Sequence, residues 1–145
     1  MDPMNELSNA PASGALPGHP SRGRLWLSRA ISALPILMML FSAALKFARS
    51  PEVIEAFSGK FGYPPGTIVP IGIAEITCVV LYAIPQTAVL GAVLMSAYLG
   101  GAVATHARVG DPFVAPALLG ILAWLGLYLR DDRVRALLPL RRPPG

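Results

Sequence analysis

Four long stretches of mainly apolar residues constrain this chain more than any other feature of its sequence. They run over about residues 25–45, 66–84, 86–106 and 112–129. An α-helix rises about 1.5 Å per residue, so about 20 apolar residues cross the roughly 30 Å hydrocarbon core of a bilayer. Because a segment in lipid must satisfy its own backbone hydrogen bonds, the pattern predicts an all-α fold, an antiparallel bundle of four transmembrane helices.

The composition agrees with a lipid environment. Hydrophobic residues make up 54% of the 145 residues and charged residues only 14%, whereas soluble domains are about 45 to 50% apolar. A chain of this length has room for one domain, which we place at residues 25–139.

Both flanks differ in composition from this domain. Residues 1–24 are rich in Pro, Gly, Ser and Ala and predict a disordered tail, while residues 140–145 predict a basic C-terminal tail. A cleaved signal peptide is the alternative for residues 25–45, because basic residues precede them and small residues lie near their end. The long preceding tail and the extended apolar run favour a retained first membrane helix.

The connections between the spans carry their own signals. Ser50-Pro51-Glu52 has the pattern of a helix N-cap followed by Pro, and the apolar residues after it predict a short amphipathic helix between the first and second spans. This helix would lie on the membrane surface or lid the bundle, and end at Gly59 or Gly62. Only Pro85 separates the second and third spans, which predicts a tight hairpin, and Asp111-Pro112 predicts the start of the fourth helix.

The distribution of Lys and Arg predicts the orientation. Eight lie toward the chain ends, namely Arg22, Arg24, Arg29, Arg130, Arg133, Arg135, Arg141 and Arg142. Four lie on the opposite side, namely Lys46, Arg49, Lys60 and Arg108. Because positive residues concentrate on the cytoplasmic side, we expect both termini in the cytoplasm. Heavy use of Ala, Arg, Gly and Pro indicates a bacterium, so the expected location is the bacterial inner membrane.

Several classes of chemistry are excluded. Cys78 is the only cysteine, so an internal disulfide or a Cys-x-x-Cys relay cannot form. The only histidines, His19 and His106, cannot supply two intramembrane ligands for a haem. Phosphate loops, nucleophile elbows and metal-ligand spacings are absent. We therefore expect no covalently bound or metal-ligated cofactor, no nucleic-acid partner and no self-contained catalytic motif.

Glu75 is the most informative position, because it lies well inside the second span, where an unpaired charge is costly. Lys46 closes the first helix, and His106 and Arg108 close the third, on the same side of the predicted bundle. Long side chains from these positions can converge on Glu75.

Two interpretations of this group stand. In the functional one, Glu75, Lys46, His106, Arg108 and Tyr98 form a pocket that binds a quinone head group, a small anion or a proton. In the structural one, Glu75 pairs with Lys46 or Arg108 to fix helix register, and His106 and Arg108 mark the water interface. Tyr98 fits either interpretation, since tyrosine stacks on flat rings and is also ordinary at helix interfaces.

The third span carries a face of small residues. Ala92, Ser96, Gly100 and Ala104 recur every four residues, a spacing that lets another helix approach closely. This face packs the bundle's own core, or it forms a homodimer seam or a partner surface; the sequence leaves these alternatives open.

Local strings add a family resemblance. They are Leu45-Lys46-Phe47, Phe61-Gly62-Tyr63-Pro64, Ala74-Glu75, the run from Tyr98 to His106 and the run from Trp124 to Asp131. Over about residues 28–139 the chain resembles the DoxX-like family of small four-helix bacterial membrane proteins. The resemblance implies the four-helix fold and, through the subunit after which the family is named, a link to thiosulfate:quinone oxidoreduction.

Two functions compete on this basis, and whether the chain is an enzyme stays open. One is a membrane subunit of an oxidoreductase, in which the pocket binds quinone and a redox protein partner supplies the electrons. The other is a non-enzymatic membrane scaffold or assembly partner that acts through the small-residue face. A proton-coupled carrier fits less well, because the chain shows no inverted repeat.

Overall fold

The computed structural model describes residues 22–138, and the regular elements in this range are all helices. In chain order they are α1 (Arg22–Phe47), α2 (Pro51–Ile54), the π-helical turn η2 (Glu55–Lys60), the 3₁₀ turn η3 (Pro65–Thr67), α3 (Ile68–Ala83), α4 (Ala88–Arg108), α5 (Val114–Arg130) and α6 (Asp132–Leu137). The all-α prediction is confirmed for these residues.

The helix boundaries differ from the predicted ones at several points. Residues 22–24 belong to α1 rather than to a tail, while the rest of the predicted N-terminal tail and residues 140–145 lie outside the described residues. The short helix α6 is an element that the apolar pattern did not predict. It exists because the side chain of Asp131 accepts hydrogen bonds from the backbone N–H groups of Arg133 and Val134.

Two connections also differ. A four-residue link, 84–87, joins α3 to α4 where Pro85 alone was predicted, and Thr87 closes it by donating from Oγ1 to the carbonyl of Leu81 at 2.8 Å. Helix α5 begins at Val114, so Asp111-Pro112 is not its cap. Asp111 instead forms an ion pair with Lys60, with 2.7 Å between Oδ1 and Nζ.

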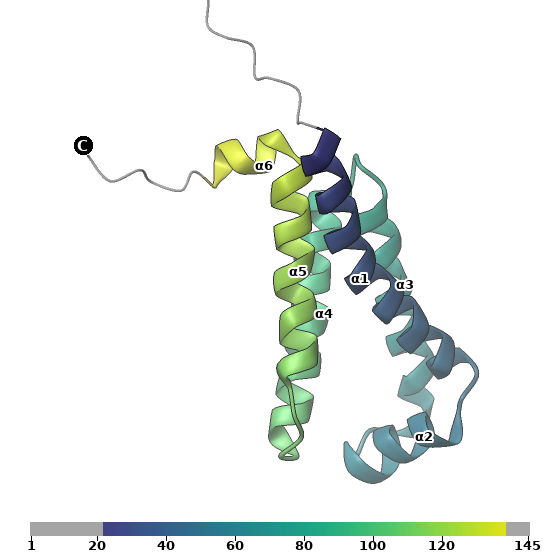
Figure 1. Cartoon of the computed structure of the whole chain (residues 1–145). Coiled ribbons are helices and arrows are strands. Elements are labelled where there is room, and N and C mark those ends of the chain that lie inside the picture. The colour runs from purple at the N-terminus through teal and green to yellow at the C-terminus, as the bar shows by residue number, and fades with distance from the viewer. Residues whose placement is uncertain (1–21, 139–145) are drawn as a thin grey trace, which may run out of the picture.

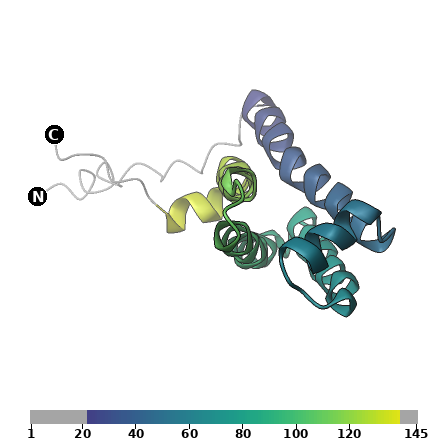
Figure 2. The same ribbon diagram turned by 90° about the horizontal axis from the view of Figure 1, so that it is seen from below.

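The four long helices pack side by side as two pairs. Helix α1 runs beside α3 and helix α4 beside α5, and the pairs meet through contacts of α1 with α5 and of α3 with α4. The pairs lie close together at the end that carries α6 and diverge toward the end that carries α2 (Figure 1). Seen from the diverging end, the α2 segment lies over α1 and α3 (Figure 2). The bundle is therefore a wedge with a narrow and a wide end.

The narrow end is held around Tyr82, whose side chain is fully buried. Its hydroxyl donates to the carbonyl of Ala123 at 2.6 Å and lies 3.1 Å from Oγ of Ser32. The guanidinium of Arg130 lies over the Tyr82 ring, 4.7 Å from its centroid, and donates to the Tyr82 carbonyl at 2.9 Å. One tyrosine of α3 thus joins α1 and α5 at this end.

Two glycines let backbones touch at the narrow end. A Cβ on Gly91 of α4 would lie 2.2 Å from the backbone nitrogen of Tyr82, and one on Gly126 of α5 would lie 2.3 Å from Oγ of Ser32. Small residues permit this close approach of helices in a membrane. There, van der Waals packing stabilises helix association, because the hydrophobic effect does not act between helices in lipid.

The outer surface of the bundle is apolar. Large hydrophobic side chains are exposed along all four long helices, including Leu37, Phe41, Ile73, Val93 and Ile121. Among the described residues, three helices are long and apolar enough to cross a membrane: Arg22–Phe47, Pro65–Ala83 and Ala88–Arg108. The apolar helix Val114–Arg130 is shorter, with 17 residues.

The predicted short helix between the first two long helices is present as α2 and η2. Ser50 caps it by accepting from the backbone N–H of Val53, and Pro51 occupies its first position, as the sequence indicated. Hydrogen bonds from the backbone N–H of Glu52 itself and from the Ser50 hydroxyl hold the pKa of Glu52 below the ordinary value of a glutamate. The helix ends at Lys60, between the two glycines predicted to end it.

We expect Gly91→Ala and Gly126→Ala each to lower stability by about 1 to 3 kcal/mol, because the new methyl group forces apart backbones already in contact. Thermal unfolding in detergent measures the effect. Gly100→Ala is the matched control on α4, since no heavy atom lies within 4 Å of the position its Cβ would take. Equal unfolding temperatures for all three variants would contradict the packing described for the narrow end.

Candidate functional site

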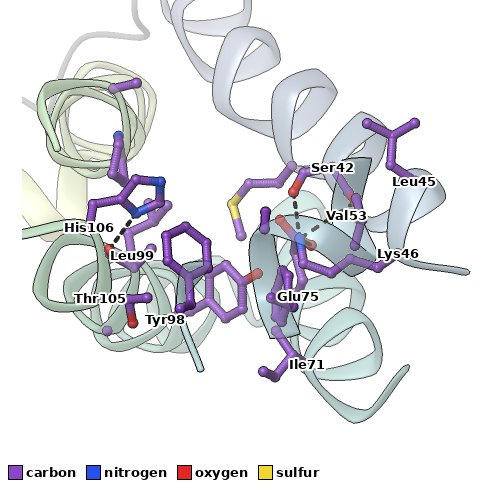
Figure 3. Close-up of a pocket in the computed structure, with 18 of the residues that line it drawn as sticks. Ser42, Leu45, Lys46, Val53, Ile71, Glu75, Tyr98, Leu99, Thr105 and His106 are labelled. Carbon is purple, nitrogen blue, oxygen red and sulfur yellow. Dashed lines mark hydrogen bonds and ion pairs between the residues drawn. The ribbon is translucent and has the colours of Figure 1, made fainter. Parts of the chain in front are cut away.

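A cavity of about 800 Å³ fills the wide end of the wedge. All four long helices and the α2–η2 segment contribute to its walls. Most of its lining is apolar, and its polar members include Ser42, Lys46, Glu75, Tyr98, Thr105 and His106 (Figure 3). Four of the five predicted pocket residues, Glu75, Lys46, His106 and Tyr98, therefore lie around one cavity.

Lys46 and Glu75 form a buried ion pair in the cavity wall. The distance from Lys46 Nζ to Glu75 Oε2 is 2.9 Å, and the two side chains are 7% and 3% exposed. Lys46 is in the last turn of α1, level with Gly72 of α3, where a Cβ would lie 3.4 Å from the Lys46 Cβ. From there its side chain extends back along the cavity to Glu75, near the middle of α3.

Further contacts hold the ammonium group. Lys46 Nζ donates to Oγ of Ser42, one turn earlier on α1, at 2.6 Å. It also lies 5.8 Å from the centroid of the Phe57 ring in η2. A buried ion pair offsets its desolvation only when additional hydrogen bonds satisfy the charged groups, and Ser42 supplies one of these.

Tyr98 faces the pair from the other arm of the wedge. It projects from α4 into the cavity with its hydroxyl toward Glu75 (Figure 3). A ligand between the two arms would therefore meet a carboxylate and an ammonium on one side and a phenol on the other. Sequence reasoning placed Tyr98 in this group only as an aromatic surface, whereas the fold presents its hydroxyl.

His106 lines the cavity without reaching Glu75. Its Nδ1 donates to the carbonyl of Ala102 at 2.8 Å, and its ring lies 5.1 Å from that of Phe61. Figure 3 shows it on the opposite side of the cavity from the ion pair. The imidazole therefore lies in the cavity wall but away from the Lys46–Glu75 ion pair.

Arg108 is the predicted pocket residue that the structure places elsewhere. Its side chain is not part of the cavity wall, and its guanidinium donates to the backbone carbonyl of Phe61. Arg108 lies beyond the point where the two arms diverge, so α4 carries it away from α3 and Glu75. Of the two partners predicted for Glu75, the structure selects Lys46.

Sequence reasoning missed the contacts that tie the α2–η2 segment to the end of α4. Lys60 pairs with Asp111, and the hydroxyls of Tyr63 and Thr105 hydrogen-bond at 2.9 Å. It also missed Ser42, although its position one turn before Lys46 was a signal, since residues four apart share a helix face. The remaining contacts join segments far apart in the chain and had no local signal.

The predicted helix-packing face of α4 is divided along its length. Ala92 is fully buried in the core. Ser96 accepts a hydrogen bond from Nε1 of Trp124 at 2.7 Å, which links α4 to α5. Gly100 and Ala104 are exposed, and no atom lies near the position of a Cβ on Gly100. The first half of the face thus packs the bundle and the second half stays uncovered.

The cavity can bind a small ring or chain and offer hydrogen bonds at one end. The paired charges of Lys46 and Glu75 compensate each other, and the phenol of Tyr98 can donate or accept. Within residues 22–138 no three His, Cys, Asp or Glu side chains gather as metal ligands. Cys78 is buried in the hydrophobic core, away from the cavity lining.

A sequence model of the DoxX-like family matches residues 30–126, which confirms the resemblance read from the local strings. The matched range includes Lys46, Glu75, Tyr98 and His106. No curated protein and no solved structure matches the chain.

We expect Lys46→Met and Glu75→Met each to lower stability by about 3 to 5 kcal/mol, because each leaves an uncompensated buried charge. The double variant should be more stable than either single one, since an apolar pair leaves no charge behind. Unfolding in detergent across the double-mutant cycle measures the coupling.

Lys60→Met is the control for this cycle, because the Lys60 side chain is 53% exposed in its pair with Asp111. It should lower stability by less than about 1 kcal/mol. Additive effects of the Lys46 and Glu75 substitutions would show that the pair is not coupled.

Proposed function

The chain belongs to the DoxX-like family, and from this premise we propose that it is a membrane subunit of an oxidoreductase complex that binds a quinone head group beside Lys46 and Glu75. Its family and its long apolar helices make it an integral membrane protein. What we propose beyond this is that the protein binds a quinone and that it belongs to an oxidoreductase complex.

The buried Lys46–Glu75 pair carries this proposal, because it stands in the wall of a cavity of about 800 Å³ that is otherwise largely apolar. Ionisable groups within membrane helices are costly and mark functional sites by default. A pair that served helix register alone would need no cavity in front of it. The cavity volume falls in the roughly 300 to 1,000 Å³ range of small-molecule sites.

The chemistry of the site fits a quinone. A quinone carbonyl accepts hydrogen bonds, which the Tyr98 phenol and the Lys46 ammonium can donate. The hydroxyl of the reduced form donates, and Glu75 can accept. The ring and its tail find apolar walls in residues such as Phe57 and Leu119.

The electrons would come from a partner protein. The chain has one cysteine, Cys78, which is buried in the core, so a thiol pair cannot carry electrons within one subunit. In the proposed complex, a redox protein bound to this subunit donates the electrons to the quinone.

We further propose that all four long helices cross the bilayer of the bacterial inner membrane. Helix α5, with 17 residues, spans about 25 Å, near the lower limit for a crossing, and it packs along α1 and α4. Both described chain ends lie at the narrow end of the wedge (Figure 1). Because most Lys and Arg residues lie toward the chain ends, this end would face the cytoplasm.

A scaffold function is the second candidate, and the uncovered half of the α4 face favours it. Gly100 and Ala104 are exposed, and Gly100 lines a groove of about 440 Å³ between α4 and α5. Small residues at four-residue spacing admit a helix of a partner or of a second copy.

Quinone copurification tests the first function. We expect wild-type protein isolated in mild detergent to carry quinone detectable by mass spectrometry. Glu75→Gln should carry about tenfold less, because the Lys46 ammonium that donates to the quinone carbonyl loses the carboxylate that holds it in place. Glu55→Gln is the matched control, since Glu55 is exposed on η2 and is not part of the cavity lining. Quinone-free wild-type protein, or equal quinone in Glu75→Gln, would contradict the proposal.

Partner capture tests the second function. We expect Gly100→Leu with Ala104→Leu to abolish copurification of a stoichiometric membrane partner if the α4 face is the contact, because the bulky side chains prevent close approach. Quinone content, measured in the same samples, should not change. Capture that survives both substitutions would reject this face as the contact surface.

A further inference from the structure

Part of the cavity wall is apolar and is formed by α1 and α5. Its lining there consists of Met38, Phe41 and Leu45 of α1 and of Ala115, Pro116 and Leu119 of α5. Helices α1 and α5 touch near the narrow end, where Ser32 meets Gly126, and diverge toward the wide end (Figures 1 and 2). Met38, Phe41 and Ala115 line the cavity and are also exposed, so the cavity opens to the outer apolar surface between these two helices.

The end of the cavity beyond the helices is different, because polar contacts cross it. Lys60 pairs with Asp111, Tyr63 hydrogen-bonds Thr105, and Arg108 donates to the carbonyl of Phe61. The Phe61 and His106 rings lie against each other in the same place. These contacts join the α2–η2 segment and the residues just after it to the end of α4, so a solute from the aqueous phase must pass them.

The two sides therefore differ in what they admit. In an integral membrane protein the outer apolar surface meets lipid tails, and an opening in it is reached from within the bilayer. A molecule on that route needs an apolar part that fits between α1 and α5 and a polar part that reaches Lys46, Glu75 and Tyr98.

We propose that the ligand is a lipid-borne amphiphile that enters sideways between α1 and α5, and that its tail remains in this opening while its head group lies at the ion pair. This inference rests on the ligand site of the proposed function but not on the head group being a quinone. It deepens that function by naming the ligand class as a long-tailed membrane molecule with a carbonyl or hydroxyl head.

Paired tryptophan substitutions test the opening. Met38 and Leu37 are neighbours on α1, 48% and 62% exposed, but only Met38 lines the cavity. Met38→Trp narrows the opening, while Leu37→Trp adds the same bulk on the lipid side. Ala115→Trp and Leu118→Trp form a second pair on α5, since Leu118 is also exposed and lies outside the cavity lining.

The probes are a quinone with a decyl tail, the same quinone ring without a tail, and decanol. Their binding to purified full-length protein is measured in detergent micelles. The tailed quinone should bind wild-type protein at least about tenfold more tightly than the tailless one, since each buried methylene contributes about 0.8 kcal/mol. Met38→Trp and Ala115→Trp should each weaken binding of the tailed quinone at least tenfold, and Leu37→Trp and Leu118→Trp less than twofold. Partition of the tail into micelles is equal for all variants and cancels in this comparison.

Equal affinity for the tailed and tailless quinones, or equal effects within both tryptophan pairs, would overturn the side entry. Decanol that binds as tightly as the tailed quinone, with the same sensitivity to Met38→Trp, would support the side entry while rejecting quinone as the ligand. The failure of the proposed function can therefore be told apart from the failure of this inference.

Discussion

The ion pair between Lys46 and Glu75 is the interaction on which the wide end depends. A carboxylate in the middle of α3 cannot stay unpartnered in an apolar bundle, and its partner is Lys46, in the last turn of α1. Lysine suits this geometry because its long stem follows apolar walls while its ammonium reaches inward. With Ser42 and the Phe57 ring beside it, the pair fixes α1, α3 and η2 relative to one another.

Different interactions hold the helices together at the narrow end. There the backbones touch at Gly91 and Gly126, and the buried hydroxyl of Tyr82 bonds across to α5. Dense packing holds the two arms together at this end, while the ion pair at the other end joins α1 and α3 within one arm. The cavity lies at the wide end, where the arms have diverged, with the ion pair in its wall.

Local sequence patterns predict much of the fold, but they predict the candidate site only in part. Apolar runs of bilayer length predict the long helices, and the rarity of a carboxylate in such a run identifies Glu75. The choice of Lys46 over Arg108 as its partner depends on how far α4 diverges from α3, which no local pattern encodes. The Lys60–Asp111 pair was missed for the same reason, since it joins segments about fifty residues apart.

The order of the paired charges along the chain bears on how the protein reaches the bilayer. Lys46 precedes Glu75 by 29 residues, so the lysine emerges from the ribosome before the carboxylate. The lysine, at the end of α1, can wait among the lipid head groups, where its charge is tolerated. When α3 inserts as the hairpin partner of α1, the carboxylate meets a cation already in position. Biogenesis can thus proceed without exposing either charge, unpaired, to the centre of the bilayer.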